Sequence, residues 1–316
     1  MSSALGAHSS PDLVYWRTMA NETIGSISSP VMGTAEAVRA IGVSEVSTAQ
    51  SQRPQPPDSV RLYVLDCGRI TGIGAREFGF KDGELATEMF TPCFLIVHPK
   101  GALMWDTGEI PDSALKDDGS TTTQRAFTVT KALLPQLASI GYTPADITYL
   151  ALSHYHNDHV ANANSFAAST WIVQRAERDL MFAPEPDTKR NGPIIPDQKF
   201  FSALKESKTT ILDNEDHDVF GDGNVVIKFS PGHTPGHQSL FLRLDRTGPV
   251  LISGDLYHYP EEMNRVANFV NHADNDQTTQ SRSAIEDFVK NEHAQIWIQH
   301  DAAHGATLKK APDFYE

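Results

Sequence analysis

The chain has 316 residues, 40% of them hydrophobic, and a formal net charge of −14. This length suits one large or two small domains, and the hydrophobic content is sufficient for a sizeable core. The negative charge argues against a nucleic-acid partner, because Lys and Arg contacts to phosphates supply most nucleic-acid affinity. No apolar stretch has the length of a membrane span, so no membrane partner is expected.

The first 58 residues differ in composition from the remainder. Ser, Ala, Thr and Pro dominate, and residues 51–58 have the composition of a linker. We therefore expect an N-terminal arm over residues 1–58, either disordered or packed on the core or on a partner subunit, and one domain over 59–316. A partner subunit would make the protein a homodimer. No secretory apolar region is evident, so the expected location is the cytoplasm, with export through an atypical leader as the alternative.

From residue 59 onward, strand-like runs alternate with helical segments. The expected strands lie at 60–65, 93–98, 102–105, 147–152, 171–174, 225–229, 239–244, 250–253 and 296–299. Apolar residues recur near a 3.6-residue period over 123–140, which ends at Gly141, and over 278–290, so both segments are expected to be helices. Cys67 and Cys93 lie in or beside apolar runs and are expected to be buried free thiols.

A dense polar cluster at residues 154–159 follows the apolar run 147–152. His154 and His156 are two positions apart, so they point the same way on an extended segment, while Asp158 and His159 follow where the chain must turn. Imidazole nitrogens and carboxylate oxygens are ligands that zinc prefers. The cluster predicts a metal site; the alternative is a polar strand end with solvated histidines.

Three later strands also end in candidate ligands, namely His233, Asp255 and His300. Loops at strand ends are where a rigid sheet presents a functional site. His237 is expected to support the Pro-Gly loop that holds His233 by hydrogen bonding. The remaining histidines have no ligand-like context: His98, His217, His272, His293 and His304.

Together these candidates resemble the seven metal ligands of the metallo-β-lactamase superfamily, in the same order, from about residue 60 to the C-terminus. Within that superfamily, residues 231–240 and 299–301 are most similar to the N-acyl homoserine lactonases, the quorum-quenching branch. The resemblance implies an α/β (α+β) fold, the αββα sandwich of two mixed β-sheets flanked by helices.

The resemblance also implies a centre of two divalent metal ions. Zinc suits the ligand set, and iron, manganese and cobalt are alternatives. By position, the ligands of one ion would be His154, His156 and His233, those of the other Asp158, His159 and His300, with Asp255 bridging the two ions. Asp106 would lie beneath the metals, where it either orients a ligand or caps its turn.

The resemblance further implies a hydrolase that opens lactone rings, N-acyl homoserine lactones foremost. Two cations that share a water lower its pKa, so a bridging hydroxide attacks the carbonyl and no Ser or Cys nucleophile is required. Asp158 is a candidate proton shuttle to the departing alkoxide. Lactonases of this branch commonly carry a tyrosine three residues after the bridging aspartate. Here His258 takes that place beside Tyr257, and each is a candidate hydrogen-bond donor to the substrate or a structural residue.

Other functions remain open for the same ligand set. They are a metal-dependent esterase or organophosphate hydrolase, a glyoxalase II-like thioesterase, and a metal-binding protein without catalysis. Residues 257–276, long for a connection, are expected to shape the substrate entrance, and Phe269 is one candidate for its apolar wall.

Overall fold

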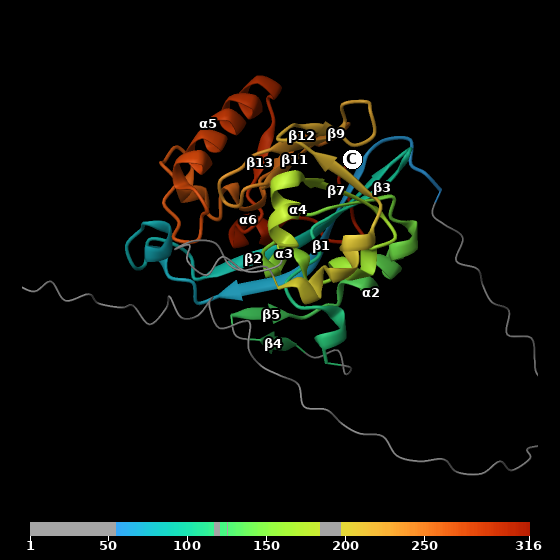
Figure 1. Ribbon diagram of the computed structural model, residues 1–316, viewed down its shortest axis with the longest axis horizontal. Coiled ribbons are helices and arrows are strands. Elements are labelled where there is room, and N and C mark those ends of the chain that lie inside the picture. Colours follow the sequence, from blue (N-terminus) through green and yellow to red (C-terminus); the bar gives the residue numbers. More distant parts are fainter. Residues whose placement is uncertain (1–54, 117–120, 125, 184–196) are drawn as a thin grey trace, which may run out of the picture. The chain divides into compact units, whose positions relative to one another are not determined.

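The computed structural model describes residues 55–116, 121–124, 126–183 and 197–316 (Figure 1). All of them belong to the unit Pro54–Glu316. The arm predicted over 1–58 lies outside the described residues except for 55–58. No helix within the described ranges is both long enough and apolar enough to cross a membrane.

The first sheet has eight strands in the order β4-β5-β1-β2-β3-β6-β7-β8. Strands β4, β5, β1, β2 and β3 pair antiparallel, whereas β3, β6, β7 and β8 pair parallel. Their bounds are β1 (Arg61–Thr71), β2 (Glu88–His98), β3 (Gly101–Trp105), β4 (Thr122–Gln124), β5 (Phe127–Val129), β6 (Tyr149–Ala151), β7 (Thr170–Gln174) and β8 (Thr209–Leu212).

The second sheet has five strands in the order β13-β12-β11-β10-β9. Only the β12–β13 pair is parallel. The strands are β9 (His217–Asp218), β10 (Val225–Phe229), β11 (Gln238–Leu244), β12 (Gly248–Ile252) and β13 (Gln295–Trp297).

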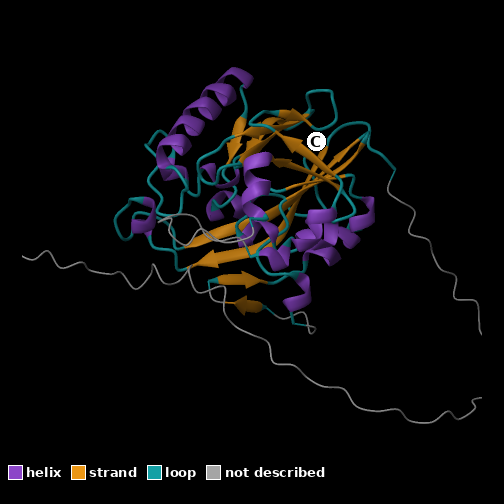
Figure 2. Ribbon diagram, in the orientation of Figure 1, coloured by secondary structure: helices purple, strands orange, loops and turns teal. Residues whose placement is uncertain are grey.

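Helices flank the two sheets (Figure 2). The α-helices are α2 (Leu133–Ser139), α3 (Asn157–Val160), α4 (Arg175–Met181), α5 (Asn275–Glu292) and α6 (Ala302–Thr307). Short 3₁₀ helices occur at η2 (Ala75–Phe78), η3 (Asp112–Ala114), η4 (Pro144–Asp146), η5 (Ala163–Phe166), η6 (Gln198–Phe200), η7 (Ser202–Glu206), η8 (Gly254–Leu256) and η9 (Pro260–Glu262).

The layers follow from the alternation of side chains along each strand. In β2, Phe94 packs in the cluster between the sheets, whereas Leu95 joins the outer cluster that contains Leu137 of α2. Leu240 of β11 likewise faces the first sheet, and its neighbour Phe241 faces α5. Because successive strand residues point to opposite faces, each sheet buries one face on the other sheet and one under helices. The order of layers is helix, sheet, sheet, helix, as expected.

All nine predicted strands are confirmed, but the predicted helix over 123–140 is wrong in its first half. Residues 127–129 form β5, which pairs with β1, and the helix begins only at Leu133. The carboxylate of Asp112 accepts hydrogen bonds from the backbone N–H groups of Leu133 and Leu134. This cap comes from about twenty residues upstream, so the local sequence carried no signal for the helix start.

The two cysteines form a disulfide, so the prediction of free thiols was wrong. Cys67 of β1 and Cys93 of β2 lie on neighbouring antiparallel strands, with Cα atoms 5.8 Å apart, a distance typical of disulfides. A break in register between Asp66 and Arg69 contributes to this placement, and the sequence alone does not reveal it.

Candidate metal centre

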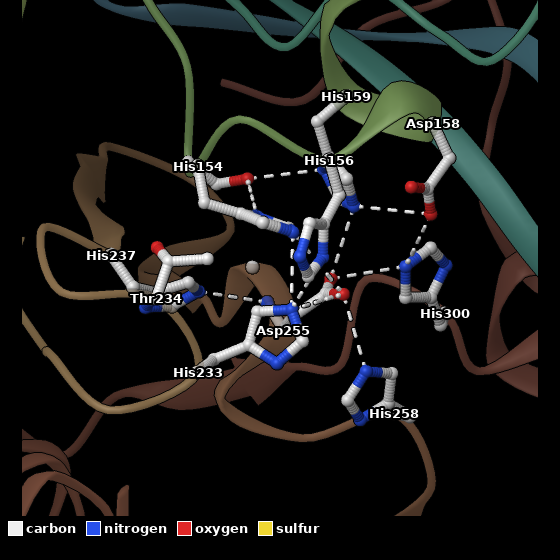
Figure 3. Close-up of polar contacts among 12 residues, drawn as sticks. His154, His156, Asp158, His159, His233, Thr234, His237, Asp255, His258 and His300 are labelled. Carbon is white, nitrogen blue, oxygen red and sulfur yellow. Dashed lines mark hydrogen bonds and ion pairs between the residues drawn. The ribbon is translucent and has the colours of Figure 1, made fainter. Parts of the chain in front are cut away.

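The strand β6 leads directly into the polar cluster at residues 154–159. His156 has extended backbone angles, and α3 begins at the next residue, so Asp158 and His159 lie on a helical turn. The change from extended to helical backbone separates the imidazoles of His154 and His156 from the side chains of Asp158 and His159. One short segment thereby supplies ligands in two directions, as Figure 3 shows.

The other candidates come from loops at the ends of distant strands. His233 lies in the turn between β10 and β11, Asp255 follows β12, and His300 follows β13. Strands β12 and β13 are parallel, so their carboxyl ends meet at one edge of the sheet. All seven predicted ligands converge there, with Asp255 at the centre (Figure 3).

The ligand atoms form two groups that share Asp255, and within each group they lie within 4.8 Å of one another. In the first group, the Nε2 atom of His233 lies 3.1 Å from Nε2 of His154, 3.0 Å from Nδ1 of His156 and 3.2 Å from Oδ2 of Asp255. Asp255 faces this group with its Oδ2 oxygen.

The second group meets the other oxygen of Asp255. Its Oδ1 atom lies 3.1 Å from Nε2 of His159 and 3.0 Å from Nε2 of His300. Oδ2 of Asp158 lies 3.3 and 3.4 Å from the same two nitrogens. The Asp255 carboxylate therefore contacts both groups, with one oxygen directed to each.

Several of these buried atoms have no hydrogen-bond partner among the described residues. They include Nε2 of His159, Nε2 of His300 and Oδ1 of Asp255. Buried polar atoms are normally paired, because leaving one unsatisfied costs about 1–3 kcal/mol. Three such atoms directed at one point fit a divalent cation as their common partner.

Electrostatics of the two groups also fit cations. Burial lowers the pKa of His154 and His156 well below the ordinary value and that of His233 to about 4, so these imidazoles are neutral and keep a lone pair. In the second group burial opposes protonation, yet Asp255 and Asp158 raise the pKa of His300 to about 10. This site therefore attracts positive charge, which a divalent ion supplies.

Comparison with known proteins decides the family. Residues 86–292 match the family model described as the metallo-beta-lactamase superfamily. The chain belongs to the metallo-beta-lactamase superfamily. It is a hydrolase of that superfamily, and the predicted fold and family are confirmed.

Relatives of this superfamily member include N-acyl homoserine lactonases. The enzyme AttM of Rhizobium radiobacter is 30% identical over 81% of this chain and 98% of its own length, and a lactonase of a Bacillus species is 27% identical over 80% and 98%. A solved N-acyl homoserine lactone hydrolase with the product N-hexanoyl-L-homoserine at its catalytic metal centre is 25% identical, with a TM-score of 0.66 over 81% of this chain and 99% of that chain.

In this superfamily hydrolase, Asp106 lies beneath the second group. Its Oδ2 atom is 2.8 Å from Nδ1 of His159 and accepts a hydrogen bond of 2.7 Å from the Gln299 amide. Its Oδ1 atom accepts from the backbone N–H of Ser153 at 2.6 Å. Of the two roles considered for Asp106, the structure supports orientation of a ligand: it fixes the ring of His159.

Hydrogen bonds hold two further histidines of the centre. Nε2 of His237 accepts from the backbone N–H of Asp255 at 2.9 Å, and its Nδ1 donates to the Ser230 carbonyl at 2.9 Å. His237 thus supports the His233 loop, as predicted, and also Asp255. Nδ1 of His300 donates to the carbonyl of Phe90 at 2.7 Å, which leaves Nε2 free to face the second group.

His272 is a partner that the sequence did not indicate. Its Nδ1 atom lies 2.9 Å from Nδ1 of His233, although the two residues are 39 positions apart. Phe269 stacks parallel to the same imidazole, with ring centroids 6.0 Å apart. The segment 257–276 therefore contacts the first group, while its role at a substrate entrance stays a prediction. No periodicity or motif marked His272 within it.

Tyr257 and His258 point in opposite directions, because the backbone at Tyr257 is extended. The Tyr257 hydroxyl donates to Glu286 of α5 at 2.6 Å, away from the ligands. Nε2 of His258 lies 3.2 Å from Oδ2 of Asp255 and its Nδ1 lies 3.5 Å from Glu262. Only His258 of this pair reaches the centre.

A cavity of about 530 Å³ adjoins His258. It is lined by Phe78, Phe80, Glu262, Arg265, Val266 and Arg282 together with Gly79, Ala267 and Asn268. Phe78 packs against the His258 ring with centroids 4.9 Å apart, and Glu262 accepts the backbone N–H of His258 at 2.6 Å. The walls of this cavity are therefore continuous with the residues that position His258.

Proposed function

We propose that this hydrolase opens the ring of lactones, N-acyl homoserine lactones foremost, at a centre of two divalent ions for which Zn²⁺ is the proposed metal. The observation that carries the proposal is Asp255, which gives one oxygen to each of two buried groups of metal-ligand type. The named activity of the relatives supports the choice of substrate. When bound, the ions supply a water-derived nucleophile and polarise the lactone carbonyl.

The proposed ligands divide as the geometry does. His154, His156 and His233 would hold one ion, Asp158, His159 and His300 would hold the other, and Asp255 belongs to both groups.

Asp158 is the proposed proton carrier. Although burial opposes ionisation, the neighbouring His159 and His300 hold the pKa of Asp158 below its ordinary value. It is therefore a carboxylate at neutral pH that can accept a proton and pass it to the alkoxide that leaves when the ring opens.

His258 is the proposed hydrogen-bond donor to the substrate carbonyl or the leaving oxygen. It takes the position at which lactonases of this branch commonly carry a tyrosine, and its imidazole is buried beside Asp255. Glu262 accepts the backbone N–H groups of His258 and Tyr259, and Arg282 in turn binds Glu262 at 2.6 Å. These contacts hold His258 in place.

Replacing His258 by Phe is therefore expected to lower kcat/KM for lactone opening about 10²-fold, the usual cost of removing one preorganised donor. Tyr257→Phe is the matched control and is expected to change kcat/KM less than about threefold, because its hydroxyl contacts Glu286 instead. Steady-state kinetics with a hexanoyl homoserine lactone measure both. Equal losses in the two variants would contradict the assignment.

The proposed activity is tested by pH-stat titration of the purified, metal-analysed protein with N-acyl homoserine lactones of short and long acyl chains. Opening of each ring releases one titratable carboxylic acid. Aryl esters, phosphotriesters and thioesters tested in parallel separate a lactonase from the related hydrolases. Protein that contains two metal equivalents but opens no lactone of any chain length would refute the proposal.

A further inference from the structure

Glu177 is a buried carboxylate that joins two loops of the metal centre. Its side chain, in the first turn of α4, belongs to a residue only 2% exposed. Oε1 accepts the backbone N–H of Tyr155 at 2.9 Å, and Oε2 accepts the backbone N–H of Gly236 at 2.8 Å. The Thr234 hydroxyl donates to both oxygens, at 2.9 and 2.8 Å.

These three partners belong to the loops that carry the first group of ligands. Tyr155 lies between His154 and His156, and Thr234 directly follows His233. One carboxylate therefore fixes the distance between the two loops whose imidazoles must meet. The separation of the two loops sets the positions of the ligand atoms. The imidazoles of His154 and His233, one from each loop, face each other with their Nε2 atoms 3.1 Å apart (Figure 3).

Gly236 shows how closely the second loop approaches α4. A Cβ atom at this position would lie 2.5 Å from Cβ of Glu177 and 2.7 Å from its backbone nitrogen. Only glycine permits this approach, which brings the N–H of residue 236 within reach of the carboxylate. Gly236, directly before His237, is thus required by packing against Glu177.

The second group is held by different residues. His159 is fixed by Asp106, and His300 by the carbonyl of Phe90. Asp255, which the groups share, is held through His237. A change at Glu177 therefore acts on both loops of the first group, but reaches the second group only through the segment 154–159 and the shared Asp255.

We propose that Glu177 is a positioning residue that selectively sets the affinity of the first group, formed by His154, His156 and His233, for its metal ion. This inference rests on the proposed metal centre. According to this proposal, a residue of α4, outside all the loops that carry ligands, sets the affinity of the protein for one of the two ions. Changes to residues that orient metal ligands typically lower metal affinity 10- to 100-fold.

The test is Glu177→Gln, which keeps the shape of the side chain but turns one acceptor into an NH₂ donor facing N–H and O–H groups. Titration of the metal-free protein with Zn²⁺ against a chromophoric chelator is expected to show one of two equivalents weakened 10- to 100-fold and the other changed less than threefold. Thermal unfolding of the metal-free protein, measured in parallel, reports any general loss of stability.

Glu109 offers a matched control. It is also buried, 3% exposed, and accepts two backbone N–H groups, from Arg69 and Thr128, and one threonine hydroxyl, from Thr91. Its donors lie on β1, β5 and β2, not on the loops of the first group. Glu109→Gln is expected to bind the zinc ion of the first group within threefold of wild type, even where its unfolding temperature falls.

A second pair of variants guards against misfolding of Glu177→Gln. Thr234→Val removes the hydroxyl but keeps the shape of the side chain, and is expected to weaken binding of the same zinc equivalent about tenfold. Thr234→Ser keeps the hydroxyl, so its zinc affinity should lie within threefold of wild type. Equal weakening of both equivalents in Glu177→Gln and Thr234→Val, or an equal selective loss in Glu109→Gln, would overturn the proposal. Zinc affinity is read without substrate, so absence of lactonase activity would refute the proposed function alone.

Discussion

Asp255→Ala is expected to lower kcat/KM for lactone opening by about 10³-fold or more. Asp255 faces both groups, with Oδ2 toward His233 and Oδ1 toward His159 and His300. Its removal would take a proposed ligand from each of the two proposed ions at once. Metal ions contribute several kcal/mol to such reactions, and each 1.4 kcal/mol corresponds to a tenfold change in rate.

Elemental analysis of the same variant should show fewer than two metal equivalents after dialysis. Asp301→Asn is the matched control, because Asp301 adjoins His300 in sequence but its carboxylate caps α6 by accepting the N–H groups of Ala303 and His304. It is expected to retain both ions and most of the turnover. An Asp255→Ala protein with two tightly bound ions would exclude the bridging role.

The seven proposed ligands were accessible from the sequence because their signals are local. The first four ligands lie close together in sequence, between His154 and His159. The other three, His233, Asp255 and His300, each follow a recognisable apolar strand. The residues that position these ligands gave no such signal. Glu177 lies in an ordinary amphipathic segment, and His272 in an irregular loop, so their roles depend on packing between elements distant in the chain.

The same distinction explains the errors in the fold. Long apolar strands were found, whereas the short polar strands β4 and β9 carry no alternating pattern and exist through pairing with neighbours. The segment 127–129 has a helix-compatible period but pairs with β1 instead. The disulfide required knowledge of the register between β1 and β2, which tertiary structure sets.

The buried ion pair between Arg282 and Glu262 gives the second large expected effect. Arg282→Met should lower the free energy of unfolding by about 3–5 kcal/mol, because it leaves the Glu262 carboxylate buried without its cation. Both side chains are 3% exposed, and their nearest atoms are 2.6 Å apart. Urea denaturation of the metal-free protein measures the loss.

The sign of the pH dependence follows from Glu262. Burial alone would raise the pKa of this carboxyl, but His258 and Arg282 lower it to about 2 from an ordinary 4.5. The stability it contributes is therefore complete above about pH 4.5 and is lost as the pH falls toward 2. Without Arg282 that loss should begin at higher pH.

Two comparisons separate the charge pair from general damage to α5. The exposed pair of Arg243 and Glu292 has the same 2.6 Å separation, with Arg243 46% exposed, so Arg243→Met should cost no more than about 1 kcal/mol. The double variant Arg282→Met with Glu262→Gln should recover part of the stability, since no buried charge is left unpaired. It should not recover turnover, because Glu262 holds the backbone of His258. Recovery of both would mean that the pair stabilises the fold without positioning His258.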